Sequence, residues 1–136
     1  MTLFVDTSVW SLTLRRDVPK DSPEVRAFTR AIEQQEAVVA TGLILQELLQ
    51  GFAGPKARDL ILDRFSPFPL IVPTRDDHIR AAELRNMCRR KGVQTSTVDA
   101  LLAQLCISHE LIMLTADQDF RHIARHAPLR LWNQPQ

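Results

Sequence analysis

Short apolar runs alternate along the chain with longer segments in which apolar residues recur every three or four positions. The short runs are typical of buried parallel strands, and the longer segments are typical of amphipathic helices. Strands are therefore predicted at residues 3–5, 37–40, 70–72, 111–114 and 129–132, and helices at 8–15, 23–36, 42–50, 56–65, 75–90, 95–108 and around 122–126. This alternation predicts a parallel sheet with helices on both faces.

The apolar positions within two of these helices also predict which faces are buried. The helix at 23–36 is expected to turn Val25, Phe28 and Ile32 toward the core. The helix from residue 42 is apolar almost throughout, so it is expected to be buried on most sides. No internal repeat, low-complexity segment or linker interrupts the pattern, which predicts one domain over residues 1–136.

Composition places the chain among ordinary globular proteins. Of its 136 residues, 45% are hydrophobic and 24% are charged, and the formal net charge is +1. Nearly balanced charge does not indicate a nucleic-acid or membrane partner, so any basic surface has to be local. No apolar run approaches the roughly 20 residues that a membrane span needs, and the first residues lack the basic start of a signal peptide. A cytoplasmic protein without membrane contact is expected.

Cysteines and histidines give little indication of a metal or redox site. Cys88 and Cys106 form no close pair, so two reduced thiols are expected. His122 and His126 are spaced to share one helix face, but no third zinc ligand is evident near them. Zinc is therefore the less favoured interpretation.

Acidic residues, in contrast, recur where strands or helices begin or end. Asp6 follows the first apolar run, Glu47 lies in the apolar helix, Asp99 opens a helix, and Asp117 and Asp119 follow the fourth apolar run. A carboxylate close to a core destabilises the fold unless it is paired, hydrogen-bonded or bound to a cation. The placement after strands matters because ligands of open α/β sheets bind at the carboxyl ends of strands.

Each acid also has a purely local interpretation. Asp6 suits a helix N-cap, and Ser96 with Asp99 matches a capping box. Asp117 suits a turn, and Glu47 suits a solvated helix flank. Taken singly, these alternatives are about as good as a functional role.

A shared metal site explains the acids jointly. Two carboxylates about 4 Å apart repel by about 4 kcal/mol at an effective dielectric constant near 20, so several of them together need a cation. Oxygen ligands without thiols or clustered imidazoles favour Mg²⁺ or Mn²⁺ over zinc. Thr115 adds a hydroxyl that can hold a carboxylate or a metal-bound water. Such metals activate water and stabilise charge on phosphate oxygens.

Basic residues are numerous but scattered, and they are densest between residues 85 and 91. Solvated helix faces are the default interpretation of such residues. The alternative is contact with a phosphate backbone around the acidic site, for which Arg85, Arg89 and Arg121 are the candidates.

At its acidic motifs the chain resembles the PIN-domain ribonucleases, in particular the VapC toxins of bacterial toxin–antitoxin pairs. The matching segments are FVDTSVW, QELLQG, TVDALLA and LTADQDF, which begin at residues 4, 46, 97 and 114. They occur in the same order and in a chain of matching length. The resemblance therefore covers essentially the whole chain.

The resemblance implies a three-layer α/β/α sandwich with a central, mostly parallel sheet. It also implies an endoribonuclease that depends on Mg²⁺ or Mn²⁺. Asp6 and Asp99 would hold the metal most directly, and Glu47 and Asp117 would bind it through water or orient the attacking water. Asp119 would be an auxiliary ligand.

Further implications concern supporting groups and partners. Thr115 and Ser8 would supply supporting hydroxyls around the acids. The protein would form a homodimer, and a small VapB-like antitoxin would inhibit it by placing its tail in the acidic groove.

Three other functions remain open at this stage. A nuclease of the same fold could process RNA or cut structured DNA, although such proteins tend to carry an additional arch or partner domain. A Mg²⁺-binding receiver domain would need an aspartate after a middle strand, where this chain has Pro73. A binding module without catalysis is disfavoured by the intact set of acids.

Overall fold

The computed structural model describes residues 2–15 and 21–133. Within this part of the chain, five strands form one parallel sheet. The strand order is β3-β2-β1-β4-β5, and every neighbouring pair is parallel. The strands are β1 (Thr2–Val5), β2 (Ala37–Thr41), β3 (Leu70–Ile71), β4 (Ile112–Leu114) and β5 (Arg130–Leu131).

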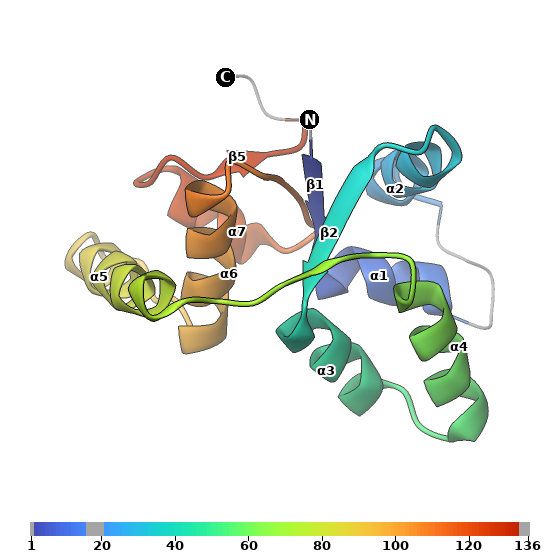
Figure 1. Cartoon of the computed structure of the whole chain (residues 1–136). Coiled ribbons are helices and arrows are strands. Elements are labelled where there is room, and N and C mark those ends of the chain that lie inside the picture. Colours follow the sequence, from blue (N-terminus) through green and yellow to red (C-terminus); the bar gives the residue numbers. More distant parts are fainter. Residues whose placement is uncertain (1, 16–20, 134–136) are drawn as a thin grey trace.

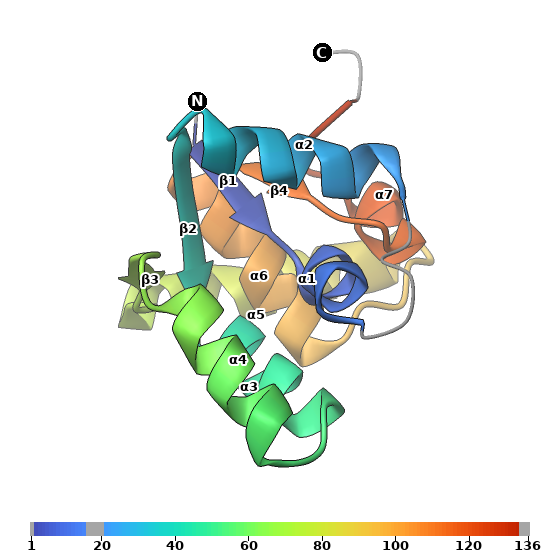
Figure 2. The ribbon, with the colours of Figure 1, turned by 90° about the vertical axis from the view of Figure 1, so that its right-hand side faces the viewer.

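Helices cover both faces of this sheet (Figure 1). Helices α5, α6 and α7 lie on one side of the strands, and α1, α2 and α4 lie on the other. Helix α3 lies below the strands in the same view, beyond the end of β2. The view at right angles shows the same layering (Figure 2), which confirms the predicted three-layer sandwich. The helices are α1 (Thr7–Leu14), α2 (Pro23–Glu33), α3 (Gly42–Gly51), α4 (Pro55–Phe65), α5 (Arg75–Arg90), α6 (Thr97–Ser108) and α7 (Gln118–Ala124).

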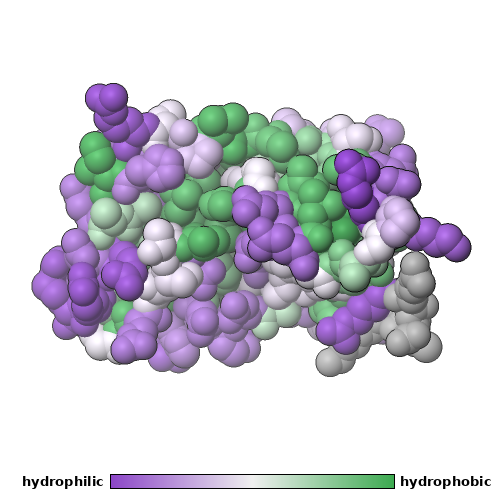
Figure 3. All heavy atoms as spheres, turned by 90° about the horizontal axis from the view of Figure 1, so that it is seen from below, coloured by the Kyte–Doolittle hydropathy of each residue, from purple (hydrophilic) through white to green (hydrophobic). Residues whose placement is uncertain are grey.

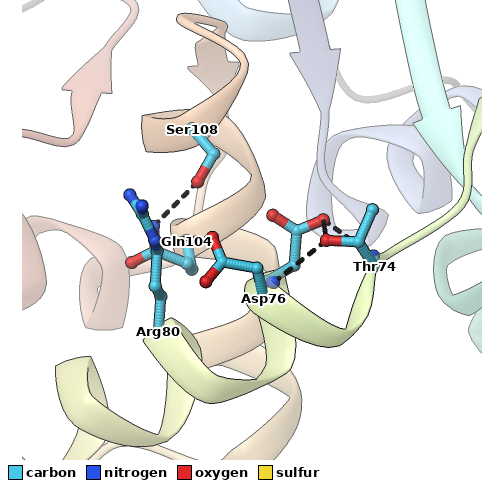
Figure 4. Close-up of polar contacts among 6 residues, drawn as sticks. Thr74, Asp76, Arg80, Gln104 and Ser108 are labelled. Carbon is cyan, nitrogen blue, oxygen red and sulfur yellow. Dashed lines mark hydrogen bonds and ion pairs between the residues drawn. The ribbon is translucent and has the colours of Figure 1, made fainter.

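Side-chain caps fix where most of these helices begin. Asp6, Ser22 and Thr41 cap α1, α2 and α3 by accepting backbone N–H groups of the first turn. Helix α5 begins with a full capping box, in which Thr74 and Asp77 each accept a hydrogen bond from the other residue's backbone (Figure 4). These caps are local, which explains why the sequence predicted the starts of α1, α2, α3 and α5 to within one residue. Helix α6 begins at 97 instead of 95, and α7 begins at 118 instead of around 122.

Some predicted boundaries were too long. Helix α2 ends at Glu33 because Gln35 adopts a positive φ of 54°. Strand β3 stops at Ile71, and the side chain of Val72 is 80% exposed. Helix α7 ends at Ala124. His126 therefore lies outside the helix and, contrary to the prediction, does not share a helix face with His122.

Burial follows the strands closely and the helices less so. Phe4 and Val5 of β1 are fully buried at the centre of the core. The expected inward face of α2 is wrong at Ile32, which is 49% exposed. Helix α3 is also less buried than predicted, since only Ile44 and Leu48 are buried in it. It lies beyond the strand ends, where the sheet does not cover it.

Both cysteines are free and buried, as expected. Burial raises the pKa of the Cys106 thiol, and the nearby Asp6 carboxylate raises it further. The thiol therefore stays protonated and is a poor nucleophile. Among the described helices, none combines the length and the apolar character that crossing a bilayer requires.

The strand order places a topological switch at β1. The chain passes from β1 to β2 and β3 on one side, and then crosses to β4 and β5 on the other. In open α/β sheets, the crevice outside the carboxyl ends at such a switch is the usual ligand site. Residues that follow β1 and β4 therefore face the place where the fold favours a ligand.

Candidate functional site

Asp6 lies at this switch, directly after β1. Val5 pairs with Leu114 in the sheet, and the Asp6 N–H donates to the Leu114 carbonyl at 2.9 Å. This pairing sets the residues after β1 beside those after β4. Although Asp6 is charged, its side chain is only 5% exposed. Such burial requires partners for the carboxylate.

Two hydroxyls supply those partners, and both use the same carboxylate oxygen. Asp6 Oδ2 accepts hydrogen bonds from Ser8 Oγ at 2.7 Å and from Thr115 Oγ1 at 2.9 Å. Each hydroxyl has a single proton, so the 3.2 Å approach of Ser8 Oγ to Thr115 Oγ1 is a close contact rather than a third bond. Among the described residues, no hydrogen bond reaches Asp6 Oδ1. That oxygen is available to a ligand.

The same two hydroxyls also hold the turn after β4. Ser8 Oγ accepts the Ala116 N–H at 2.9 Å, and Thr115 Oγ1 accepts the Asp117 N–H at 3.0 Å. Ser8 and Thr115 therefore connect the end of β1 to the start of α7. The sequence predicted these residues as supporting hydroxyls, and the structure places both against Asp6.

Three aspartates converge next to this network. Asp99, Asp117 and Asp119 each present a carboxylate oxygen, and these oxygens lie within 4.8 Å of one another. Asp117 also caps α7 by accepting the Asp119 N–H at 2.9 Å. The local and the functional interpretations of Asp117 are thus compatible. Asp119, which the sequence ranked behind Asp117, belongs to the same group.

Asp99 forms only half of its predicted capping box. Its N–H donates to Ser96 Oγ at 3.0 Å, but among the described residues its carboxylate accepts no return bond. Partial burial, together with the negative charges of Asp6 and Asp117, raises the pKa of Asp99 to about 6. Asp119 and Glu47 contribute in the same sense. The carboxylate is thus surrounded by like charge, which a bound cation would offset.

Glu47 joins the site through a contact that the sequence did not indicate. Thr7 Oγ1 donates to Glu47 Oε1 at 3.1 Å, which links α1 to α3. Glu47 is an exposed residue, but its carboxyl group is partly desolvated. This desolvation raises the pKa of Glu47. The hydrogen bond from Thr7 lowers the pKa, the negative charge of Asp6 raises it, and the net shift is upward. In the sequence, only the position of Thr7 directly after Asp6 could have indicated that its hydroxyl takes part in the site.

The three candidate arginines do not form one surface. Arg85 and Arg89 lie on α5 and line a common cavity with the loop that precedes α6. The Arg85 Nε donates to the Thr95 carbonyl at 2.8 Å, so this side chain also holds that loop. Arg121 lies exposed on α7 and does not line this cavity.

Figure 3 looks onto the end of the molecule toward which the strands point. Hydrophilic side chains gather at its left, where Figure 1 places α5. Hydrophobic patches lie toward the middle and right, in the region of α3 and α4. The acidic site thus opens on a face that is polar toward α5 and more apolar toward α3.

Divalent cations fit the residues of this site. Carboxylate oxygens are the ligands that Mg²⁺ and Mn²⁺ prefer, and at least three of them converge here. The free Oδ1 of Asp6 extends this set, and the carboxylate of Asp99, already a member, accepts no hydrogen bond from the described residues. Among the described residues, no cysteine or histidine belongs to the group.

Comparisons with known proteins agree with this fold. The structure is similar to that of VapBC2 from Rickettsia felis bound to a promoter DNA fragment, with 17% identity, a TM-score of 0.78, and coverage of 99% of this chain and 100% of that chain. It is also similar to VapC20 from Mycobacterium tuberculosis, a sarcin–ricin loop cleaving toxin, with 22% identity, a TM-score of 0.65, and coverage of 88% and 92%. VapBC-1 from nontypeable Haemophilus influenzae shares 14% identity at a TM-score of 0.74, with 96% of each chain covered.

The family-level comparison matches nearly the whole described chain. The model of the PIN domain family aligns with residues 3–126, a range that includes all five acids of the site. It extends from β1 to just beyond α7 and so contains the switch point. The chain therefore belongs to the PIN domain family.

Proposed function

We propose that this protein is a metal-dependent endoribonuclease and the toxin of a toxin–antitoxin pair. The convergence of Asp99, Asp117 and Asp119 beside Asp6, at the carboxyl ends of β1 and β4, carries the proposal. Structural resemblance to VapC20, a toxin that cleaves the sarcin–ricin loop, supports RNA as the substrate class.

The acids would hold Mg²⁺ or Mn²⁺. Asp6, through Oδ1, and Asp99 are the most direct candidates, with Asp117, Asp119 and Glu47 as further ligands. When bound, the cation would supply charge stabilisation at phosphate oxygens and increase the acidity of water.

The protein's own groups then have distinct tasks. Ser8 and Thr115 hold Asp6 Oδ2 and so leave Oδ1 free to bind the cation. Glu47 accepts a proton from the attacking water at Oε2, because Oε1 is occupied by Thr7 and a raised pKa makes its carboxylate a better base. The water oxygen bonds to phosphorus, the P–O bond to the leaving nucleotide breaks, and that oxygen takes a proton from solvent.

A cleavage assay tests this function directly. Purified protein is incubated with transfer RNA, ribosomal RNA or branched DNA, in the presence of Mg²⁺, Mn²⁺ or EDTA. We expect cleavage of RNA with either metal and none with EDTA. Preferential cleavage of branched DNA would instead support a nuclease of the same fold that acts on structured DNA, and saturable Mg²⁺ binding without any cleavage would support a binding module.

The hydroxyl network provides a finer test of the site. Thr115→Val should lower RNA cleavage by about 10- to 100-fold, because groups that orient metal ligands have effects of this size. The substitution removes the bonds to Asp6 and to the Asp117 N–H while the shape of the side chain is kept. Thr29→Val in α2 is a matched control, since its hydroxyl only donates to the Val25 carbonyl. Equal rates for both variants would contradict the assigned role of Thr115.

A VapB-like antitoxin is the proposed partner. Several similar structures are VapBC proteins, which supports this assignment. An apolar cavity of about 520 Å³ between α1, α2 and α4 offers such a partner a surface, lined in part by Trp10, Phe28 and Phe68. Co-expression with the product of a neighbouring small reading frame tests the pairing: co-purification and loss of RNA cleavage are expected.

We also propose that the protein is a homodimer. Leu70, Val72 and Ile79 are 44%, 80% and 51% exposed, and they lie in the edge strand β3, in the segment after it and in α5. Large apolar side chains that are this exposed at the edge of a sheet are candidates for a contact surface. Light scattering should give twice the chain mass of 15.5 kDa.

A further inference from the structure

The cavity lined by Arg85 and Arg89 lies beside the acidic site, between the end of α5 and the start of α6. It has a volume of about 550 Å³ and is lined by Arg85, Arg89, Val93, Gln94, Thr95 and Ser96. Two of these residues carry positive charge and none is acidic. The cavity therefore has the opposite charge to the neighbouring carboxylate group.

The two guanidinium groups in this cavity retain unused donors. Arg85 donates through Nε to the Thr95 carbonyl, which leaves both of its Nη groups without a hydrogen bond among the described residues. Arg89 donates through Nη2 to Asn86 Oδ1 at 2.6 Å, which leaves Nε and Nη1. Within the described chain, neither arginine forms an ion pair. Guanidinium groups with free N–H groups are suited to bind phosphate oxygens.

A buried hydroxyl in the cavity wall also lacks a partner. Thr95 is 8% exposed, and its Oγ1 makes no hydrogen bond with any described residue. Unsatisfied buried hydroxyls are unfavourable, so their presence calls for an explanation. Less than 1 Å² of this oxygen is accessible, so a ligand in the cavity would reach it only after a small side-chain rotation.

The cavity is adjacent to the metal-binding acids because one of its lining residues caps α6, the helix that carries Asp99. Ser96, in the cavity wall, caps the helix, and Asp99 lies three residues further along the same face. Three residues correspond to a rise of about 4.5 Å along a helix. The start of α6 also directs its positive dipole end toward this region. A chain of phosphates that approaches Asp99 along the start of α6 therefore passes close to both arginines.

We propose that this cavity is a phosphate subsite, in which Arg85 and Arg89 bind a phosphodiester of the RNA strand next to the one that is cleaved. The proposal rests on the ribonuclease function proposed above and adds a site for the substrate strand. The acids repel RNA when no cation is present, whereas the arginines attract it. The subsite would thus hold the strand in place over the acidic group.

The test compares two neighbouring arginines in an Asp99→Asn protein, which is expected to bind RNA without cleaving it. Arg89→Ala removes a cavity residue, and Arg90→Ala is the matched control, because Arg90 is exposed on the same helix but does not line the cavity. Binding of a short fluorescein-labelled single-stranded RNA is measured by anisotropy over a series of salt concentrations. We expect Arg89→Ala to weaken binding about fivefold and to reduce the slope of log K against log salt by about 0.7, the value for one phosphate contact. Arg90→Ala should change affinity by less than about twofold.

Two outcomes of the anisotropy comparison would overturn the proposal. Equal losses in both variants would show general attraction rather than a subsite, and no loss in either would show that the cavity does not contact RNA. A free anion is the competing ligand, so inorganic phosphate is titrated while the Arg85 and Arg89 Nε–H signals are followed by NMR. Saturation by phosphate that RNA cannot displace would assign the cavity to a free anion and also contradict the proposal.

A cleavage measurement separates this proposal from the proposed ribonuclease function. If the unmodified protein cleaves RNA but Arg89→Ala and Arg90→Ala bind and cleave alike, the subsite is wrong and the ribonuclease function stands. If no metal-dependent cleavage occurs but Arg89→Ala alone weakens RNA binding, the subsite stands and the ribonuclease function is wrong.

Discussion

Asp99→Asn should abolish metal-dependent RNA cleavage, with a loss of at least about 10³-fold, or about 4 kcal/mol of activation free energy. Asparagine keeps the size of the side chain, and the N–H to Ser96 Oγ hydrogen bond uses only the backbone of residue 99. The substitution therefore removes the charge without removing the helix cap. Asp99 is half-buried and four other carboxylates act on it, so a cation bound at this residue offsets a large part of the local negative charge.

Single-turnover cleavage rates check this prediction, together with a thermal unfolding curve that excludes misfolding. Asp76→Asn is the matched control, because Asp76 also lies in the first turn of a helix but forms only an exposed pair with Arg80 (Figure 4). It should leave cleavage unchanged. Full activity in purified Asp99→Asn would remove this residue from the proposed metal site.

Metal binding should stabilise the protein at pH 7.5 and much less at pH 5. The raised pKa of Asp99, about 6 against an ordinary 3.8, means that the folded state takes up a proton more readily than the unfolded state. Without metal, Asp99 therefore lowers the free energy of unfolding as pH rises from about 4 to above 6. Its contribution to stability is fully retained only at the acidic end of this window. The raised pKa of Glu47 acts in the same direction.

Mg²⁺ or Mn²⁺ competes with protons for these carboxylates, so the stabilisation of the folded state by metal depends on pH. A cation present at 100 times its dissociation constant stabilises the folded state by about 2.7 kcal/mol, and protonated carboxyls at pH 5 weaken that binding. In EDTA, Asp99→Asn should be more stable than the unmodified protein by about 1–2 kcal/mol above pH 6. The full pKa shift would give about 3 kcal/mol, but solvent screens this half-buried group.

Thermal unfolding at both pH values, with metal and with EDTA, measures these differences. The comparison with Asp99→Asn cancels the contribution of the other titrating groups. Equal stabilisation by metal at pH 5 and pH 7.5, or identical pH profiles for the two proteins in EDTA, would contradict the assignment of Asp99.

Local features of the sequence predicted most of the elements. Apolar runs such as residues 111–114 and caps such as Thr41 act over a few residues, so they could be recognised without the fold. Predictions that depended on distant packing were less accurate. The exposure of Ile32 and of much of α3 follows from where the sheet ends, which helix periodicity does not specify.

The candidate site divides in the same way. Its acids could be identified from their positions after strands and at helix starts. The contact between Thr7 and Glu47 joins residues 40 positions apart, and the contact between Thr115 and Asp6 joins residues 109 positions apart. No local pattern specifies such pairs. Likewise, the basic segment around residue 89 became informative only when the fold closed a cavity around it.

An α/β chain with acids after its strands could be predicted from neighbouring residues alone, because apolar runs, caps and turns are local properties. Three features exist only in the folded chain: β1 and β4 lie side by side, one oxygen of Asp6 is occupied by two hydroxyls while the other is free, and two arginines share a cavity next to Asp99. Strand order and side-chain convergence depend on packing between segments far apart in the chain. Within one segment, neither is encoded.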